Sequence, residues 1–202
     1  VTEQTGRIRA SFLNAIRALA YALEAKDKYT SGHSQRVADI SAAIAKEMGL
    51  SGESTDRIVL AGLVHDIGKI GVKEAVLNKP ESLTNDEFQH VKKHPEIGER
   101  ILAPIADDEE MLKLVRNHHE HFDGSGYPDL PKDHELPLGA RILAVADAYE
   151  AMTSERPYRK AMSDEAACAE LEHGKGNQFD PEVVDAFLRC KNGWRREKNT
   201  GR

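Results

Sequence analysis

Apolar residues recur every three or four positions over most of the chain, and this spacing limits the fold more than any other feature. The longest such series runs from Ile8 to Leu23. It predicts an amphipathic helix over about the first 26 residues. Similar series predict helices at 37–48, 54–64, 111–118 and 139–152. No alternating pattern long enough for a β-strand is present, so we expect an all-α fold, a compact multi-helix bundle.

Local signals mark several helix ends. Thr84 followed by Glu87 predicts a capping box for a helix that carries His94. Pro95 should end or restart that helix, because proline lacks a backbone N–H. Two later helices have predicted N-caps, at Ser163 and Asp180.

Composition excludes several classes of protein. The formal net charge of -6 argues against broad nucleic-acid binding, which normally requires a basic face. No stretch approaches the roughly 20 apolar residues needed to span a bilayer, and no basic-then-apolar leader follows Val1. The two cysteines are too few for a disulfide framework. We therefore expect a cytoplasmic piece of a longer chain, such as a sensor or response regulator.

The adjacent residues His65 and Asp66 end a predicted helix. Neighbouring side chains on a helix diverge by roughly 100°. The imidazole could therefore bind one metal ion while the carboxylate leans across to a second. A capped helix end that binds no metal is the alternative for this pair taken alone.

Further histidines and one aspartate occur in positions that suit metal ligands. His33 opens a predicted helix, and Asp147 lies inside an otherwise apolar one. Aspartate is rarely buried unless it is paired or bound to a metal, and a salt bridge from Asp147 to Arg141 or a hydrogen bond within the helix is the alternative. Imidazole and carboxylate together suit Fe, Mn or Zn, and a bridging carboxylate suits a pair of such ions. The remaining candidates are His94, His118 and His119.

Five motifs follow one another along the chain. They are Tyr29-Thr30-Ser31-Gly32-His33-Ser34, His65-Asp66-Ile67-Gly68-Lys69, His118-His119-Glu120, Asp123-Gly124-Ser125-Gly126-Tyr127-Pro128 and Arg156-Pro157-Tyr158-Arg159. In this order they closely resemble the HD-GYP phosphodiesterases, over about residues 10 to 190. The resemblance implies an HD-domain helical bundle. Residues 120–137, rich in Gly, Pro, Asp and His, would form a long loop over its active site.

The resemblance also implies roles for single residues. The first metal ion would be held by His33, His65, Asp66 and Asp147, and Asp66 would bridge to a second ion completed by His94, His118 and His119. The implied substrate-binding residues are Lys69, Gly126, Tyr127, Arg156 and Arg159, with Asp66 and Lys69 also catalytic. Some relatives hold a third metal through a carboxylate at the place of Tyr29. We therefore expect two divalent transition-metal ions, Fe or Mn.

The reaction implied by the resemblance is hydrolysis of cyclic di-GMP to pGpG, GMP or both. Two metal ions about 3.5 to 4 Å apart can activate a hydroxide and clamp the attacking and leaving oxygens of an in-line displacement at phosphorus. One alternative is an HD-type phosphohydrolase for another cyclic dinucleotide or nucleotide. The other is a non-catalytic signalling module that binds cyclic di-GMP.

The chain is expected to have three parts. Residues 1–30 would form an amphipathic connector or dimerisation helix from an upstream domain, residues 31–192 the HD-GYP catalytic domain, and residues 193–202 a flexible basic tail. The expected protein partners are a second copy of the chain, through the first helix, and a diguanylate cyclase. We expect no nucleic acid and no membrane contact from this segment.

Other polar groups have simpler interpretations. His90 lies one turn before His94 and could form a two-histidine metal clip, but we favour a solvated surface histidine. His121 could hydrogen-bond a ligand in the candidate site. The acidic run at 107–110 is interpreted as a helix N-terminus favoured by the macrodipole.

Overall fold

The computed structural model describes residues 15–24, 32–129, 136–155 and 160–200. Within these ranges the chain is mostly helical and contains no extended strand, only an isolated bridge between Lys175 and Phe179. The predicted all-α fold is confirmed. Tyr29, His134, Arg156 and Arg159 lie outside the described residues.

A helical segment at residues 15–24 comes first in the described chain. It is followed by α2 (His33–Glu47), α3 (Gly52–Val64), the 3-10 helix η1 (Ile67–Gly71), α4 (Glu74–Leu77), α5 (Asn85–Val91), α6 (His94–Leu102), α7 (Glu109–Asn117), α8 (Leu138–Thr153), α9 (Asp164–His173) and α10 (Pro181–Thr200). The long loop predicted after α7 is present in the part that the structure describes, residues 120–129 and 136–137.

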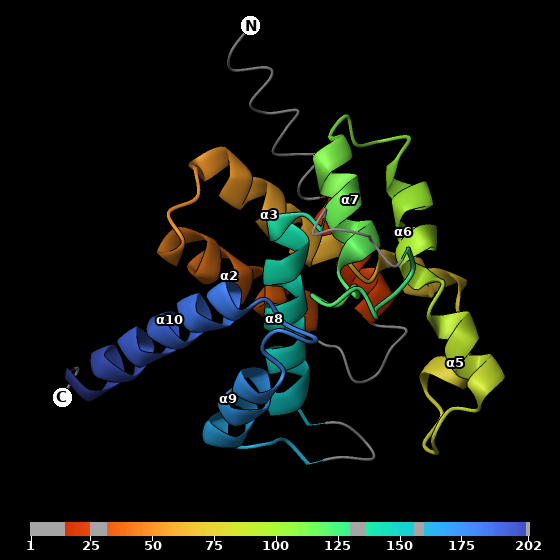
Figure 1. The fold of residues 1–202 in the computed structure, drawn as a ribbon. Coiled ribbons are helices and arrows are strands. Elements are labelled where there is room, and N and C mark those ends of the chain that lie inside the picture. The colour runs from red at the N-terminus through yellow and green to blue at the C-terminus, as the bar shows by residue number, and fades with distance from the viewer. Residues whose placement is uncertain (1–14, 25–31, 130–135, 156–159, 201–202) are drawn as a thin grey trace, which may run out of the picture.

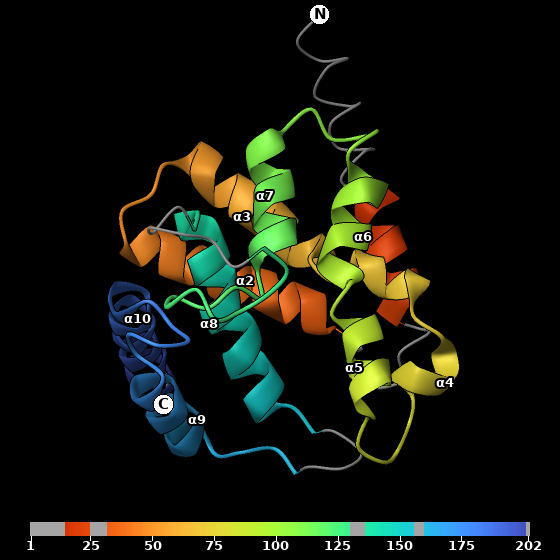
Figure 2. The same ribbon diagram turned by 45° about the vertical axis from the view of Figure 1, so that its right-hand side comes forward.

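Helices α2 and α8 form the centre of the bundle. Figure 1 shows α8 running through the middle of the molecule, with α9 and α10 on one side and α5 and α6 on the other. Helix α2 packs against α3, α8 and α10, while α6 packs against η1 and α7. The turned view in Figure 2 shows α6 and α7 side by side. The core is made of fully buried side chains from these helices, among them Val37, Ile44, Ile142, Leu143 and Phe187. This packing brings the ends of several helices to one place.

The helix break predicted at Pro95 occurs just before His94, so the prediction that His94 belongs to the helix begun at Thr84 is wrong. The Thr84 hydroxyl accepts from the Glu87 N–H, and the Glu87 carboxylate accepts from the Thr84 N–H, so the capping box is confirmed. However, α5 ends at Val91, and His94 is the first residue of α6 rather than part of α5. Proline is tolerated in a first helical turn because the N–H groups there have no partner within the helix.

The other predicted caps are also present. Asp108 accepts from the Met111 N–H at 3.0 Å, which confirms that the acidic run begins a helix. Ser163 accepts from the Ala166 N–H, and Asp180 accepts from the Glu182 N–H.

Residues 15–24 lie against the bundle, because Ile16, Ala20 and Leu23 are buried whereas Leu19 and Tyr21 are exposed. At the other end, α10 continues to Thr200. The division into connector, catalytic domain and tail stays a prediction. Among the described residues, no helix combines the length and apolar character that crossing a bilayer requires.

Candidate metal centre

The structure brings the seven predicted metal ligands together from five helices and the ends that adjoin them. Six of these residues stand at helix ends: His33 begins α2, His65 and Asp66 follow α3, His94 begins α6, and His118 and His119 follow α7. Asp147 is the exception, since it lies within α8. The bundle therefore positions the site through helix termini that are far apart in the sequence.

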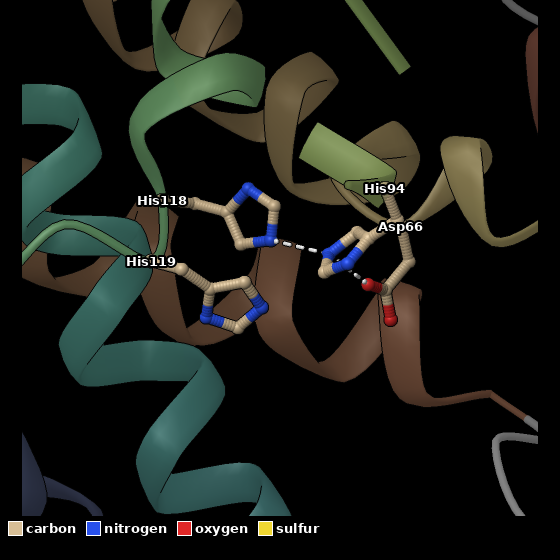
Figure 3. Close-up of side chains that lie close together, drawn as sticks. All are labelled: Asp66, His94, His118 and His119. Carbon is tan, nitrogen blue, oxygen red and sulfur yellow. Dashed lines mark hydrogen bonds and ion pairs between the residues drawn. The ribbon is translucent and has the colours of Figure 1, made fainter. Parts of the chain in front are cut away.

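These side chains form two groups that share Asp66. We call them the His33 group, with His33, His65 and Asp66, and the His94 group, with Asp66, His94, His118 and His119. Within each group the ligand atoms all lie within 4.8 Å of one another, and Figure 3 shows the four side chains of the His94 group converging. Asp66 Oδ1 lies 3.3 Å from His94 Nε2, and Asp66 Oδ2 lies 3.5 Å from His65 Nε2. Each oxygen thus faces a different group.

Asp147 adds a second carboxylate to the His33 group. Its Oδ1 lies 3.3 Å from His33 Nε2 and 4.0 Å from His65 Nε2. The alternative salt bridge to Arg141 is wrong, because Arg141 pairs with Asp180 at 2.6 Å. A partly buried carboxylate beside two imidazoles is suited to binding a cation.

Three histidine rings are oriented by the same kind of hydrogen bond to a backbone carbonyl. The Nδ1 atoms of His65, His94 and His118 lie 2.7–2.8 Å from the carbonyl oxygen of the residue three positions earlier. A carbonyl only accepts hydrogen bonds, so each Nδ1 carries the proton. In the neutral ring Nε2 then carries a lone pair that faces into the site, which is the form in which histidine binds a metal.

The donor atoms of the His94 group suit a cation. His94 Nε2 and His118 Nε2 lie 3.2 Å apart with lone pairs facing each other, and the buried Asp66 Oδ1 accepts no hydrogen bond. Burial, together with His65 and His94, holds the pKa of His118 well below its ordinary value, so a proton does not readily fill the gap. A metal ion would satisfy all three atoms. The residues present therefore fit divalent metal binding.

The His33 group attracts positive charge as well. Burial lowers the pKa of His33, but the hydrogen bond to Glu150 and the charges of Asp147 and Asp66 outweigh burial and raise it. Burial would raise the pKa of Asp66, yet Lys69 and the neighbouring histidines hold it well below its ordinary value. Lys69 Nζ lies 2.6 Å from Asp66 Oδ2. Asp66 is thus ionised, as a metal ligand must be.

A cleft of about 240 Å³ opens beside the two groups. Its lining residues are His118, His119, Glu120, His121, Tyr127, Ala144, Asp147, Ala148 and Gln178. The Tyr127 ring stacks on His119 with centroids 4.9 Å apart, and burial raises the pKa of its phenol, so the hydroxyl stays protonated. A Cβ at Gly126 would lie 2.3 Å from the His121 nitrogen, so only glycine allows this turn of the loop.

Two residues that the sequence analysis missed lie near the cleft. The Lys92 ammonium stands 4.8 Å above the Tyr127 ring, which places a cation beside the stack on His119. Gln178 comes from the turn before α10, and its carbonyl accepts from the Phe122 N–H at 3.1 Å, so this turn supports the loop. Neither residue belongs to a motif that marks it in the sequence.

Two minor predictions can also be placed. His90 is exposed and belongs to neither group, as expected for a surface histidine. His121 Nδ1 lies 2.9 Å from the Ser125 hydroxyl oxygen, and the His121 side chain lines the cleft.

Glu24 holds the start of α2, where His33 stands. Its buried carboxylate accepts from the N–H groups of Gly32 at 2.7 Å and Ser34 at 2.9 Å. These N–H groups flank His33 and belong to a helix N-terminus, which favours a negative charge. Glu24 therefore links the segment 15–24 to the first candidate ligand.

Glu24→Ala is expected to lower the free energy of unfolding by about 1.5–3 kcal/mol, because two hydrogen bonds to a charged group are lost at a buried site. Urea unfolding of the metal-free protein measures this change. The control is Glu47→Ala, which removes an exposed carboxylate paired with Arg189 and should cost about 1 kcal/mol or less. Equal effects of the two substitutions would contradict the capping role.

Comparison with known proteins identifies the class. The family model of the HD domain matches residues 17–183, and the chain belongs to the HD-domain family. Its relatives also confirm the predicted resemblance to the HD-GYP group. The cyclic di-GMP phosphodiesterase response regulator RpfG of Xanthomonas campestris is 42% identical over 85% of this chain and 46% of its own length. A cyclic di-GMP phosphodiesterase of Thermotoga maritima is 42% identical over 87% of this chain and 50% of its own length.

A solved structure agrees with this assignment. The cyclic GMP-AMP specific phosphodiesterase V-cGAP3 of Vibrio cholerae superposes with a TM-score of 0.56 and is 32% identical, covering 88% of this chain and 40% of that protein. The chain spans half the length of these relatives or less.

Proposed function

We propose that this chain is a metal-dependent phosphodiesterase that hydrolyses cyclic di-GMP to pGpG, GMP or both. The observation that carries the proposal is the position of Asp66, whose two oxygens face two separate histidine groups beside a cleft. The names of the relatives from Xanthomonas and Thermotoga support cyclic di-GMP as the substrate.

The metal ions would be held by the seven ligands, with Asp66 shared. When bound, two such ions supply a nucleophile from water at neutral pH and neutralise charge on the phosphate. The protein's own part is to orient the ligand rings through fixed Nδ1 hydrogen bonds and to shape the cleft with the Gly126–Tyr127 loop. Lys69 lies beside Asp66, and we assign its ammonium group to the substrate phosphate.

Finer parts of the proposal rest on the sequence. We assign Fe or Mn to the site because of its mixed imidazole and carboxylate ligands, and two ions because Tyr29 occupies the place of a third-metal carboxylate. Arg156 and Arg159 are proposed to bind substrate. A homodimer through the first helix, a diguanylate cyclase partner and a cytoplasmic location complete the proposal.

The proposed function is tested by product formation under anaerobic conditions. The purified chain is loaded with Fe(II) or Mn(II) and incubated separately with cyclic di-GMP, cyclic GMP-AMP and cyclic di-AMP. We expect pGpG or GMP from cyclic di-GMP, and no product from a His118→Ala control that has lost a ligand of the His94 group. If cyclic GMP-AMP is hydrolysed faster than cyclic di-GMP, the proposed substrate is wrong and cyclic GMP-AMP takes its place, as the name of the Vibrio cholerae relative suggests.

The principal competing function is a non-catalytic module that binds cyclic di-GMP. The complete set of seven ligands argues against it, because binding alone does not require two groups that share a carboxylate. Two bound metals and tight cyclic di-GMP binding without any product would favour this alternative over catalysis.

A further inference from the structure

We propose that Glu150 is a positioning residue that makes the His33 group the tighter of the two metal sites. The inference rests on the metal binding in the proposed function, but not on the identity of the substrate. Glu150 lies in α8 one turn after Asp147 and is only 3% exposed.

Both oxygens of Glu150 have fixed partners. Oε2 accepts a short hydrogen bond from His33 Nδ1. Oε1 accepts from Arg36 Nε at 2.7 Å and from the Ser154 hydroxyl at 2.6 Å. Arg36 stands on α2 one turn after His33, so the contacts tie the two central helices together at the ligand. The ring of His33 is therefore held from behind by a carboxylate that cannot easily rotate.

Glu150 forms an ion pair despite its burial. Its Oε1 lies 2.5 Å from Arg36 Nη2, while its Oε2 faces His33. A carboxylate whose other oxygen is paired with Arg36 thus lies directly behind one ligand ring.

His33 differs in this respect from the other hydrogen-bonded rings. The Nδ1 atoms of His65, His94 and His118 donate to neutral backbone carbonyls. A carboxylate acceptor makes the opposite ring nitrogen more basic and a stronger donor to a metal than a carbonyl acceptor does. His33 Nε2 is therefore the strongest imidazole donor among these four rings.

The two groups also differ in charge. The His33 group contains the shared Asp66. In addition, Asp147 Oδ1 lies 3.3 Å from His33 Nε2, and Glu150 contacts the opposite nitrogen of the same ring. In the His94 group the three members other than Asp66 are histidines, which bring no negative charge. A divalent cation is attracted more strongly where more carboxylates surround it. The His33 group should consequently fill first.

The filling order is measured on the wild-type chain. Metal-free protein receives Mn(II) in substoichiometric steps, and the electron paramagnetic resonance signal of free Mn(II) gives the binding curve. Anomalous scattering from crystals grown at half occupancy then assigns each step to a group. We expect two classes of site whose Kd values differ by about 10-fold or more, with the His33 group occupied first. Equal occupancy, or the reverse order, overturns the inference whether or not any variant folds.

Glu150→Gln tests the cause. The single amide oxygen can still accept from His33 Nδ1, the amide NH2 group then stands where Oε1 accepted from Arg36 and Ser154, and the charge is lost. We expect the Kd of the His33 group to rise by about 10- to 100-fold while that of the His94 group changes by less than about 3-fold. The unchanged His94 group also reports that the fold is intact. The matched control is Glu155→Gln, which removes the same charge from an exposed residue just beyond α8 and should leave both Kd values unchanged.

The outcomes separate this inference from the proposed function. If Glu150→Gln weakens both groups equally or neither group, Glu150 does not set the difference between them. If the wild type binds two Mn(II) ions in the expected order but hydrolyses no cyclic dinucleotide, the proposed function fails and the role of Glu150 stands.

Discussion

Asp66→Ala is expected to release both metal ions together and to abolish hydrolysis. Asp66 is the one residue that the two groups share among the described side chains, with one oxygen 3.3 Å from His94 Nε2 and the other 3.5 Å from His65 Nε2. Two cations a few ångströms apart repel each other strongly, and the carboxylate between them offsets that repulsion. Its loss should lower metal occupancy at both positions, and not only at one.

His94→Ala is the matched control, because this residue belongs to a single group. It should weaken the ion of the His94 group and leave the His33 group partly occupied. Metal stoichiometry, helical circular dichroism and product formation are measured on the same samples. The helical signal should survive in both variants, since the apolar core does not depend on these side chains. Two bound metals with normal turnover in Asp66→Ala would refute the bridging role.

The helices and the first candidate ligands could be predicted from the sequence because their signals lie within a few neighbouring residues. Amphipathic spacing, the Thr84 capping box and the Pro95 break each depend on residues a few positions apart. The pair His65-Asp66 is adjacent, so its divergence on a helix follows from geometry alone. The family resemblance grouped the other candidate ligands with that pair, which no local pattern could have done.

The residues that orient the ligands could not be predicted in this way. Glu150 contacts His33 although the two residues are 117 positions apart in the sequence, and Glu24 contacts Ser34 from the separate helical segment at residues 15–24. A glutamate within an amphipathic helix is ordinarily a surface residue. Only the packing of α2 against α8 turns Glu150 into a buried partner of the site.

The contact between η1 and α6 depends on Gly68, and it sets the position of Asp66 relative to His94. A Cβ at this position would lie 1.9 Å from the His94 carbonyl oxygen and 2.5 Å from the Gly98 nitrogen, both backbone atoms. Gly68 follows Asp66 by two residues, and His94 begins the helix it touches. Neither backbone can yield without moving a ligand, so a side chain here must force η1 and α6 apart.

Gly68→Ala is therefore expected to lower the free energy of unfolding by about 3 kcal/mol, at the upper end of the range for overpacking. It should also reduce metal binding, because Asp66 and His94 move apart and can no longer face one ion. Urea unfolding of the metal-free protein and metal stoichiometry measure the two effects separately. The control is Gly52→Ala in α3, where a Cβ meets no atom within 4 Å and alanine should be neutral or stabilising by up to about 1 kcal/mol. Should Gly68→Ala retain wild-type stability and two metals, the spacing of Asp66 and His94 would have to be set by other contacts than this one.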